Sequence, residues 1–420
     1  MRKIIHIFIC SLFLISCVNQ EADIFSSSAA ERLNTAMRDD QSVLQSSENG
    51  WNMEYFATSV SPGYNLLIKF STSGQAIIAG KSELTNNTYQ TDSCLYEMIG
   101  DDGPVLTFNT FSKVLHAFSN PENPDGYGLE GDYEFVVMSK SSDQIILKGK
   151  KRGVTIILNK IPTDSSWSQY VADLDAMNSL LFSANTPKLT MVIGTAYYSF
   201  SNGINHVFSI LKQGGGTNVA IDAPFIVTKT GIRFQTAQEI GGVKFQTMTL
   251  SDDKSALVSV DNSNLKLFGV EDLSAYFTGN VITWEFIPTE LSANTKTIYD
   301  KIIQSCTTKY NAENVKLAIK YYTTRKSFEL SLSYTIGGVK TEGNIDLNIS
   351  STGKNSLSLL YKGTSDTNGL SYYNNVAGFS DMATIISDNF VLSTNSMLNP
   401  QKIKFSKKTD VSTYFTVFHQ

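Results

Sequence analysis

The sequence lacks an apolar run that could cross a membrane as a helix. Its N-terminal apolar segment spans only residues 4–15, and a membrane helix needs about 20 residues. Charges are also few, at 17% of residues, and bases are not in excess, with 34 Lys and Arg against 39 Asp and Glu. Proteins that bind nucleic acid usually carry a basic surface. The composition therefore argues against a nucleic-acid partner.

Cysteine is scarce, with four residues in the whole chain. Cys10 and Cys17 lie close to the N-terminus, so only Cys94 and Cys306 remain for the body of the protein. Free cysteine is among the most buried residue types, and we expect two separate buried thiols. A disulfide between them is the alternative in an oxidising compartment.

Histidine is equally rare, and His116, His206 and His419 have no His or Cys partner at zinc-type spacing. We expect the first two in half-buried strand positions and His419 at a frayed terminus. The chain also lacks the signatures of a nucleophile elbow, a zinc protease and a phosphate loop. We therefore predict no metal, no cofactor and no catalytic residue, and we favour a non-enzyme without excluding an enzyme.

The N-terminus carries the most specific pattern in the chain. Arg2 and Lys3 precede the apolar segment, and Leu14-Ile15-Ser16-Cys17 closes it. A basic start, a short apolar stretch and a small residue before the cut are typical of a secretory signal, and the final four residues resemble a bacterial lipobox. We predict a signal peptide over residues 1–16, lipid attachment at Cys17 and a tether over residues 17–27. The several acyl chains of a mature lipoprotein hold a protein firmly at a membrane.

The rest of the chain repeats one order of elements, a helix followed by strands. Ser28 and Glu31 form a capping-box pattern at the first helix. Pro162 and Pro288 precede the second and third helices, and a further helix is expected near Val376. We predict an α+β fold of mainly antiparallel sheet, in which each module is a sheet or a lipocalin-like partial barrel with a covering helix. The modules are expected at residues 28–162, 163–288 and 289–420, the third alternatively forming one unit with the second.

Alternation of apolar and polar residues predicts the strands of the first module. They are expected at Tyr64–Phe70, Gln75–Ile78, Val105–Phe108, Tyr133–Met138, Ile145–Lys148 and Val154–Leu158.

The pentapeptide Ile-Gly-Gly-Val-Lys occurs twice, at residues 240–244 and 336–340. Two glycines between apolar strand residues predict a two-residue hairpin turn. The two copies lie at different distances from their leading helices. We therefore interpret them as similar hairpins rather than as a sign of duplication.

One loop offers two candidate ligand patterns, and a plain surface loop is the favoured interpretation of both. Gly126, Gly128 and Gly131 match the letters of a dinucleotide motif, but a strand rather than a helix is expected to follow them. The loop also contains the oxygen donors that calcium prefers. These donors are Asn120, Glu122, Asn123, Asp125, Glu130 and Asp132.

Charged clusters elsewhere are expected to be turns. The acid pairs lie beside turn residues, although distant carboxylates of a glycosidase could still converge in space. These pairs are Asp101-Asp102, Asp252-Asp253 and Glu271-Asp272. The basic cluster at residues 148–153 could bind a polyanion, but a solvated hairpin turn is favoured.

Three tyrosine pairs are candidates for sugar binding. In a strand, neighbouring side chains point to opposite faces, so one ring of each strand pair is expected to be exposed. The alternative is that tyrosine simply favours strands. The pairs are Tyr197-Tyr198, Tyr321-Tyr322 and Tyr372-Tyr373.

Six segments of the first module show a shared resemblance, namely residues 28–33, 50–55, 63–70, 103–108, 131–136 and 147–151. They resemble one family, the domain-of-unknown-function group 4302 of Bacteroidota lipoproteins. The resemblance is clear over Ser28 to Ile161 and thinner beyond. It implies an outer-membrane lipoprotein beside a TonB-dependent nutrient-uptake system of the starch-utilisation type. It implies no catalytic residues, because the family has no established activity.

Together these observations predict a lipid-anchored cell-envelope protein that binds a glycan or peptide as an accessory subunit of an uptake system. The acids Glu21 and Asp23 behind Cys17 favour the cell surface over the periplasmic face. Two other functions remain open at this point. One is a hydrolase of glycan or peptide, and the other is an adhesin or assembly subunit.

Overall fold

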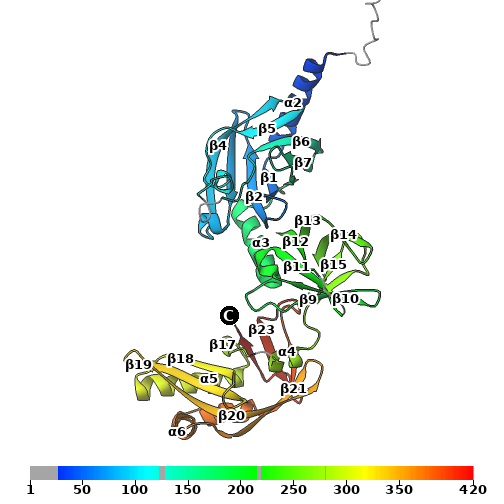
Figure 1. The fold of residues 1–420 in the computed structure, drawn as a ribbon. Coiled ribbons are helices and arrows are strands. Elements are labelled where there is room, and N and C mark those ends of the chain that lie inside the picture. Colours follow the sequence, from blue (N-terminus) through cyan, green and yellow to red (C-terminus); the bar gives the residue numbers. More distant parts are fainter. Residues whose placement is uncertain (1–26, 102, 123–127, 215–218, 280, 420) are drawn as a thin grey trace, which may run out of the picture. The chain divides into compact units, whose positions relative to one another are not determined.

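The chain forms three closed barrels of eight strands each (Figure 1). The computed structural model describes residues 27–101, 103–122, 128–214, 219–279 and 281–419. The predicted α+β class with mainly antiparallel sheet is confirmed. The expected open sheet or partial barrel is not, because the first and last strands of each module pair with one another. A closed barrel has no free strand edge.

The residues group into two compact units. One holds Leu66–Asp164 and the described residues up to Met53, and the other holds Glu54–Asn65 and Ser165–Gln420. The second and third barrels thus fall in the same unit. None of the described helices is both long and apolar enough to cross a membrane.

Barrel 1 begins with helix α2, and the predicted capping box is confirmed. The Ser28 hydroxyl accepts a hydrogen bond from the Glu31 backbone N–H at 3.2 Å, and the Glu31 carboxylate accepts one from the Ser28 N–H at 2.9 Å. The buried Trp51 indole donates to the Leu44 carbonyl at 2.8 Å and ties the helix end to the first strand. The elements are α2 Ala29–Gln45, β1 Trp51–Phe56, β2 Gly63–Phe70, β3 Gln75–Gly80, β4 Gln90–Gly100, β5 Pro104–Phe108, β6 Glu134–Lys140, β7 Gln144–Gly149 and β8 Thr155–Lys160, with 3₁₀ turns at Glu83–Thr85 and His116–Phe118.

Phenylalanine side chains make up much of the core of barrel 2. The rings of Phe208 and Phe225 stack with centroids 4.6 Å apart, and Phe182, just after helix α3, packs against both. Ser166 is the N-cap of that helix, since its hydroxyl accepts from the Gln169 N–H at 3.2 Å. The elements are α3 Trp167–Leu181, β9 Leu189–Ile193, β10 Ala196–Ser201, β11 Val207–Lys212, β12 Ile221–Thr228, β13 Gly231–Ile240, β14 Val243–Leu250, β15 Ala256–Ser259 and β16 Lys266–Phe268, with a 3₁₀ turn at Gly203–Asn205.

Barrel 3 places its helices between strands, and helix α5 contributes Tyr299, Ile302 and Cys306 to the core. Helix α6 lies very close to strand β20: a Cβ on Gly369 would stand 1.9 Å from the Asn344 carbonyl oxygen. The elements are α4 Leu273–Gly279, β17 Trp284–Leu291, α5 Ala293–Tyr310, β18 Glu313–Tyr322, β19 Ser327–Ile336, β20 Val339–Gly353, β21 Ser356–Thr364, α6 Thr367–Asn375, α7 Phe379–Ile385, β22 Asp388–Ser393, β23 Lys402–Lys407 and β24 Tyr414–Phe418.

Three sequence predictions need correction. The boundary expected between residues 288 and 289 falls inside β17, which pairs with β18 and β24 and so belongs to barrel 3. Helix α4 lies in a segment where only strands were expected. Strand β4 was missed, because polar residues such as Asp92 and Glu97 occupy its outer face and weaken the apolar alternation.

Both Gly-Gly hairpins are confirmed. Ile240 pairs with Val243 and Ile336 pairs with Val339, and all four glycines have φ between 55° and 82°. Two successive positive φ values are the geometry of a tight hairpin turn, which glycine adopts without strain. The first hairpin joins the fifth and sixth strands of its barrel and the second joins the third and fourth, which fits the interpretation of similar turns rather than duplicated modules.

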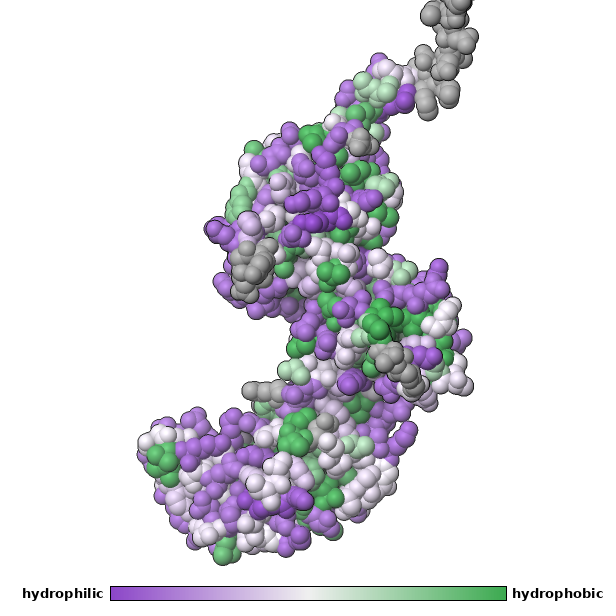
Figure 2. Space-filling model, in the orientation of Figure 1, coloured by the Kyte–Doolittle hydropathy of each residue, from purple (hydrophilic) through white to green (hydrophobic). Residues whose placement is uncertain are grey.

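Apolar side chains fill the barrels, and the outside is mainly polar. On the face drawn in Figure 2, hydrophilic residues cover most of the surface and apolar ones are scattered. Function is therefore best sought where apolar or charged side chains gather on this polar exterior.

Candidate functional site

The structure brings several of the sequence candidates together in barrel 1. The loop between β5 and β6 contains Glu130 and Asp132, and the basic cluster forms the hairpin between β7 and β8. The two segments are joined by a backbone hydrogen bond from the Lys150 N–H to the Glu134 carbonyl at 2.9 Å. The predicted solvated turn at residues 148–153 is therefore a hairpin, and acidic residues surround it.

Asp132 holds this hairpin in shape. Its carboxylate accepts hydrogen bonds from the backbone N–H groups of Lys151 at 3.2 Å and Arg152 at 2.8 Å. The carboxylate of Asp132 can come this close to the hairpin only because residue 149 is glycine, since a Cβ there would stand 2.1 Å from an Asp132 carboxylate oxygen. The Arg152 guanidinium in turn pairs with Glu130 at 2.9 Å. The acidic loop therefore binds the hairpin.

The structure shows where the predicted calcium donors lie and which groups they bind. Glu130 and Asp132 face the hairpin, and the Asn120 side chain accepts from the Glu122 N–H at 3.0 Å in a local turn. Asn123 and Asp125 lie outside the described residues. No group of three His, Cys, Asp or Glu side chains that could hold a metal ion occurs in the described part of the chain.

The dinucleotide pattern also lacks its structural context. Gly126 is outside the described residues, whereas Gly131 is followed by strand β6. A dinucleotide motif needs a helix there, because the helix N-terminus binds the pyrophosphate. The plain-loop interpretation is thus the better one.

Lys150 adds a second set of ion pairs. Its ammonium lies 2.8 Å from an Asp101 oxygen and 3.7 Å from a Glu134 oxygen, and the hydrogen bond to Asp101 raises the pKa of Lys150. Asp102, the other member of that acid pair, lies outside the described residues. Two hollows of about 460 and 360 Å³ adjoin the hairpin, and both are lined by Lys150 and Lys151. We call them together the hairpin hollow.

The charges of the hairpin hollow balance. Four bases of the hairpin and four acids line the two hollows, so the site presents both hydrogen-bond donors and acceptors. Ammonium and guanidinium groups can only donate and carboxylates can only accept. The bases are Lys148, Lys150, Lys151 and Arg152, and the acids are Asp101, Glu130, Asp132 and Glu134.

A row of aromatic rings flanks this hollow. His116 lies between Phe111 and Tyr133, with centroid distances of 5.7 and 5.1 Å and interplanar angles of 36° and 33°. Phe111 is 63% exposed and Tyr133 is 41% exposed, and Tyr133 also lines the larger hollow. We call these three residues the aromatic row. Its outer rings present apolar faces beside a polar hollow.

His116 is held as a neutral ring within this row. Its Nδ1 accepts from the Ser112 N–H at 3.0 Å, so Nε2 carries the proton and donates to the Phe108 carbonyl at 3.3 Å. Burial lowers the pKa of His116 below its ordinary value of 6.5, which keeps it uncharged at neutral pH. It lies in a 3₁₀ turn and not in the strand expected above.

Sequence reasoning missed the aromatic row. Its members come from a loop, a 3₁₀ turn and the start of a strand, and are 5 and 17 positions apart in sequence. No helical or strand period links such positions. The one sequence signal for this site is that Phe111 lies among the polar residues Asn109, Thr110 and Ser112, which indicates an exposed aromatic ring.

The tyrosine pairs fall into different environments. In the first strand pair one ring is exposed as predicted: Tyr197 is 54% exposed, whereas Tyr198 is buried. In the second strand pair the prediction is wrong, because Tyr321 and Tyr322 are both half-buried. Tyr321 packs on Phe328, and Tyr322 points to the opposite face. The third pair lies on helix α6, where Tyr372 is buried and Tyr373 stacks on Tyr361 at 5.1 Å.

The remaining acid pairs form local turns or caps. Hydrogen bonds from Ser251 and Ser255 lower the pKa of Asp253 to about 2. Asp272 accepts from the Ser274 N–H at 2.9 Å at the start of α4. Turn chemistry is thus confirmed for these two.

The other histidines and the cysteines have structural positions. His206 follows a 3₁₀ turn and lies 2.8 Å from the Asn178 side-chain oxygen. His419 is buried against Trp284 with centroids 4.6 Å apart, so the expectation of a frayed terminus is wrong. Cys94 and Cys306 are both free and buried, as expected. Cys17 lies outside the described residues.

Comparison with known proteins gives one clear result. A family model described as "Domain of unknown function (DUF4302)" matches residues 21–252, which include barrel 1 and most strands of barrel 2. No curated protein sequence matches the chain.

Solved structures give only weak similarities. The β subunit of DNA polymerase from Streptococcus pyogenes is 11% identical with a TM-score of 0.16, over 93% of this chain and 96% of that one. The DNA polymerase III β chain of Streptococcus pneumoniae is 10% identical with a TM-score of 0.16, over 91% and 97%. The β subunit from Borrelia burgdorferi is 10% identical with a TM-score of 0.14, over 92% and 97%. Scores this low support no inference about the chain.

Proposed function

Because the chain belongs to the family described as Domain of unknown function (DUF4302), whose description names no activity, we propose a function from its own residues. The protein is a lipid-anchored, non-enzymatic glycan-binding protein of the bacterial outer membrane. It faces the cell surface and serves as an accessory subunit of a TonB-dependent nutrient-uptake system. Its ligand binds at the aromatic row and hairpin hollow of barrel 1.

The N-terminal pattern supports the location. A basic start, a short apolar segment and Cys17 behind Leu14-Ile15-Ser16 are what lipoprotein processing requires. The segment is too short to remain as a membrane helix. Lipid on Cys17 is then the contact with the membrane.

The aromatic row is the observation that carries the ligand assignment. A sugar ring has apolar C–H faces, which can pack on exposed aromatic rings, and hydroxyl groups that both donate and accept hydrogen bonds. Phe111 and Tyr133 provide the rings, and the hairpin hollow provides a balanced set of donors and acceptors next to them. Binding sites typically combine apolar and aromatic walls with a few placed polar groups in this way. An extended peptide, in contrast, usually pairs with a free strand edge, and a closed barrel has none.

The charged groups favour binding over catalysis. A glycosidase needs one carboxylic acid with a raised pKa beside one carboxylate. Seven carboxyl groups in the described part of the chain have a pKa below the ordinary value, namely Glu31, Asp173, Asp253, Asp272, Glu342, Asp388 and Asp410. In the hairpin hollow, Glu130 and Glu134 pair with the basic side chains of Arg152 and Lys150.

A glycan array probed with the chain from Val18 onward tests the proposal. We expect binding of a neutral oligosaccharide without release of reducing ends. The Phe111→Ala and Tyr133→Ala changes should each weaken binding about 2- to 10-fold, because ring packing contributes about 0.5–1.5 kcal/mol. Tyr197→Ala removes an equally exposed tyrosine from barrel 2 and should leave binding unchanged.

Three outcomes would contradict the proposal. The first is an array without a bound glycan, and the second is binding that survives loss of both rings. The third is turnover of a bound oligosaccharide, which would support the hydrolase instead. Normal growth of a deletion strain on the bound glycan would refute the uptake role alone.

A further inference from the structure

Barrel 3 carries a polar trough on the outer face of strands β18 to β20. Residues that face the core alternate with polar ones, and the outward side chains of the middle strand are small: Ser331, Ser333 and Thr335. Longer side chains stand on the strands to either side. In register, Ser333 lies between Lys316 of β18 and Glu342 of β20, and Thr335 lies opposite Lys340.

The residues of this outer face line a hollow. Its volume is about 450 Å³, and its walls include three lysines and the polar groups of Thr283 and Asn314. A second hollow of about 330 Å³ continues from it, since both are lined by Thr283 and Glu285 of the β17 region. We call the larger hollow the lysine trough.

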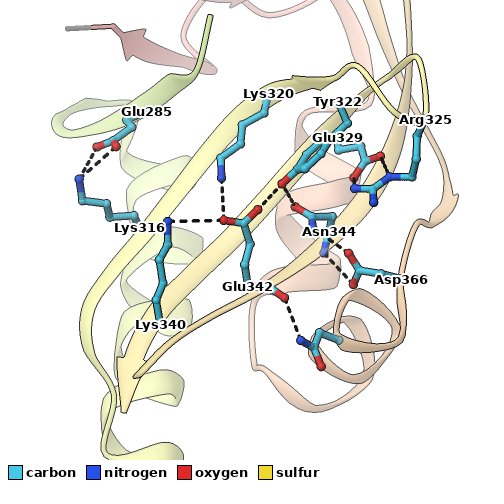
Figure 3. Close-up of polar contacts among 11 residues, drawn as sticks. Glu285, Lys316, Lys320, Tyr322, Arg325, Glu329, Lys340, Glu342, Asn344 and Asp366 are labelled. Carbon is cyan, nitrogen blue, oxygen red and sulfur yellow. Dashed lines mark hydrogen bonds and ion pairs between the residues drawn. The ribbon is translucent and has the colours of Figure 1, made fainter. Parts of the chain in front are cut away.

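Lysines outnumber the carboxylates of the lysine trough. Lys316 pairs with Glu285 at 3.0 Å, while Lys320 and Lys340 share Glu342 at 2.7 and 3.7 Å (Figure 3). Among these five side chains one positive charge is therefore in excess, while Glu313 lies opposite Thr335 at the start of β18.

Two of these lysines can turn to a ligand. The side chains of Lys316 and Lys340 are 55% and 69% exposed, and exposed ion pairs contribute little stability. Their ammonium groups can move to an incoming anion at small cost.

Next to Lys320, a network of hydrogen bonds holds the outer face of the sheet. Glu342 accepts hydrogen bonds from Lys320 and from the Tyr322 hydroxyl, whose oxygen also lies 2.9 Å from the Asn344 side-chain oxygen (Figure 3). Asn344 donates in turn to Asp366 at 2.7 Å. Burial acts against ionisation of Glu342, but these hydrogen bonds hold its pKa below the ordinary value.

Arg325 extends this network. Its guanidinium lies 4.2 Å from the centre of the Tyr322 ring and binds both oxygens of the buried Glu329. The network thus holds Lys320, whereas Lys316 and Lys340 stay exposed.

We propose that the lysine trough binds an acidic glycan, with a sugar carboxylate seated between Lys316 and Lys340 above the hydroxyls of Ser333 and Thr335. The inference rests on the proposed function only in taking the ligand to be a glycan. The polar walls supply partners for sugar hydroxyls next to the carboxylate seat. An acidic peptide is disfavoured because the strands around the trough already pair on both sides, which leaves no edge for strand addition.

The test is a calorimetric titration of the chain from Val18 onward. The probes are a galacturonic acid oligosaccharide, a neutral galactose oligosaccharide of equal length and a glutamate oligopeptide. We expect binding of the galacturonate that weakens with added salt, because exposed charges are screened. The double change Lys316→Gln/Lys340→Gln should lower that affinity about tenfold or more. Lys354→Gln removes one positive charge from an exposed turn of barrel 3 and should change the affinity less than about twofold.

Several results would overturn the inference. They are no heat of binding with galacturonate, an affinity that the double change leaves intact, or equal affinity for the glutamate peptide. Failure here is distinguishable from failure of the proposed function. The lysine changes should leave neutral glycan binding at barrel 1 untouched, and Phe111→Ala should leave galacturonate binding untouched.

Discussion

Replacing Asp132 by alanine should loosen the basic hairpin of barrel 1 without unfolding the barrel. The change removes two charge-assisted hydrogen bonds, from the N–H groups of Lys151 and Arg152. Such bonds contribute about 1.5–3 kcal/mol each when they are shielded. Water can replace part of this at a surface hairpin, so we take about 1 kcal/mol for each and roughly 2 kcal/mol in total. The free energy of local opening at the hairpin should fall by that amount.

Hydrogen exchange measures this opening directly. A loss of about 2 kcal/mol corresponds to roughly 30-fold faster exchange of the two amides, since 1.36 kcal/mol is a factor of ten. Mass spectrometry of peptides that cover residues 145–155 would detect it. Neutral glycan binding should weaken in parallel, because Lys150 and Lys151 line the hollow that this hairpin shapes.

A matched variant separates hydrogen bonding from charge. Glu130→Gln also removes a negative charge beside the hairpin, but Glu130 pairs with the Arg152 side chain. Its effect on exchange of the Lys151 and Arg152 amides should be much smaller. If both variants changed exchange equally, or if Asp132→Ala left it unchanged, Asp132 would not be the residue that holds the hairpin.

Three further predictions concern the rest of the chain. Gly369→Ala would put a methyl group 1.9 Å from the Asn344 carbonyl oxygen and should destabilise barrel 3 by about 3 kcal/mol. Denaturant titration measures this loss, and an unchanged unfolding midpoint would show that α6 moves freely. Burial raises the pKa of the Cys94 and Cys306 thiols from 9 to about 11, so alkylation at pH 8 should require unfolding. The two neutral thiols make their full contribution to the free energy of unfolding below pH 9, and this contribution is lost as the pH rises through 11. Rapid labelling of the native protein would contradict the burial of the thiols. Cys17→Ala should move the protein from the membrane to the soluble fraction, and a variant that stayed with the membrane would refute the lipid anchor.

Short-range features of the fold were predictable because their causes lie within a few residues. The capping box of Ser28 and Glu31 needs only a hydroxyl and a carboxylate three positions apart. The two Gly-Gly turns need only two residues that accept positive φ. Alternation likewise predicted that one of Tyr197 and Tyr198 would be exposed and the other buried.

Features that depend on long-range pairing were predicted less well. Alternation indicates a strand but does not say whether the first and last strands of a module meet, so closure of the barrels was not foreseen. Strand β4 was missed because its outward residues are polar, and β17 was assigned to the wrong module because its partners, β18 and β24, follow it in sequence. The assignment of these two strands depends on how they pair in the tertiary structure.

From the sequence alone the mainly antiparallel fold class could be predicted, and separate buried thiols at Cys94 and Cys306 were the favoured expectation. The candidate ligand sites could be found only from the tertiary structure. The aromatic row joins Phe111, His116 and Tyr133 from separate segments, and the lysine trough depends on the register that sets Lys316 and Lys340 on either side of the short side chains of β19. Local patterns specify elements, whereas sites arise from the packing of elements that are distant in the chain.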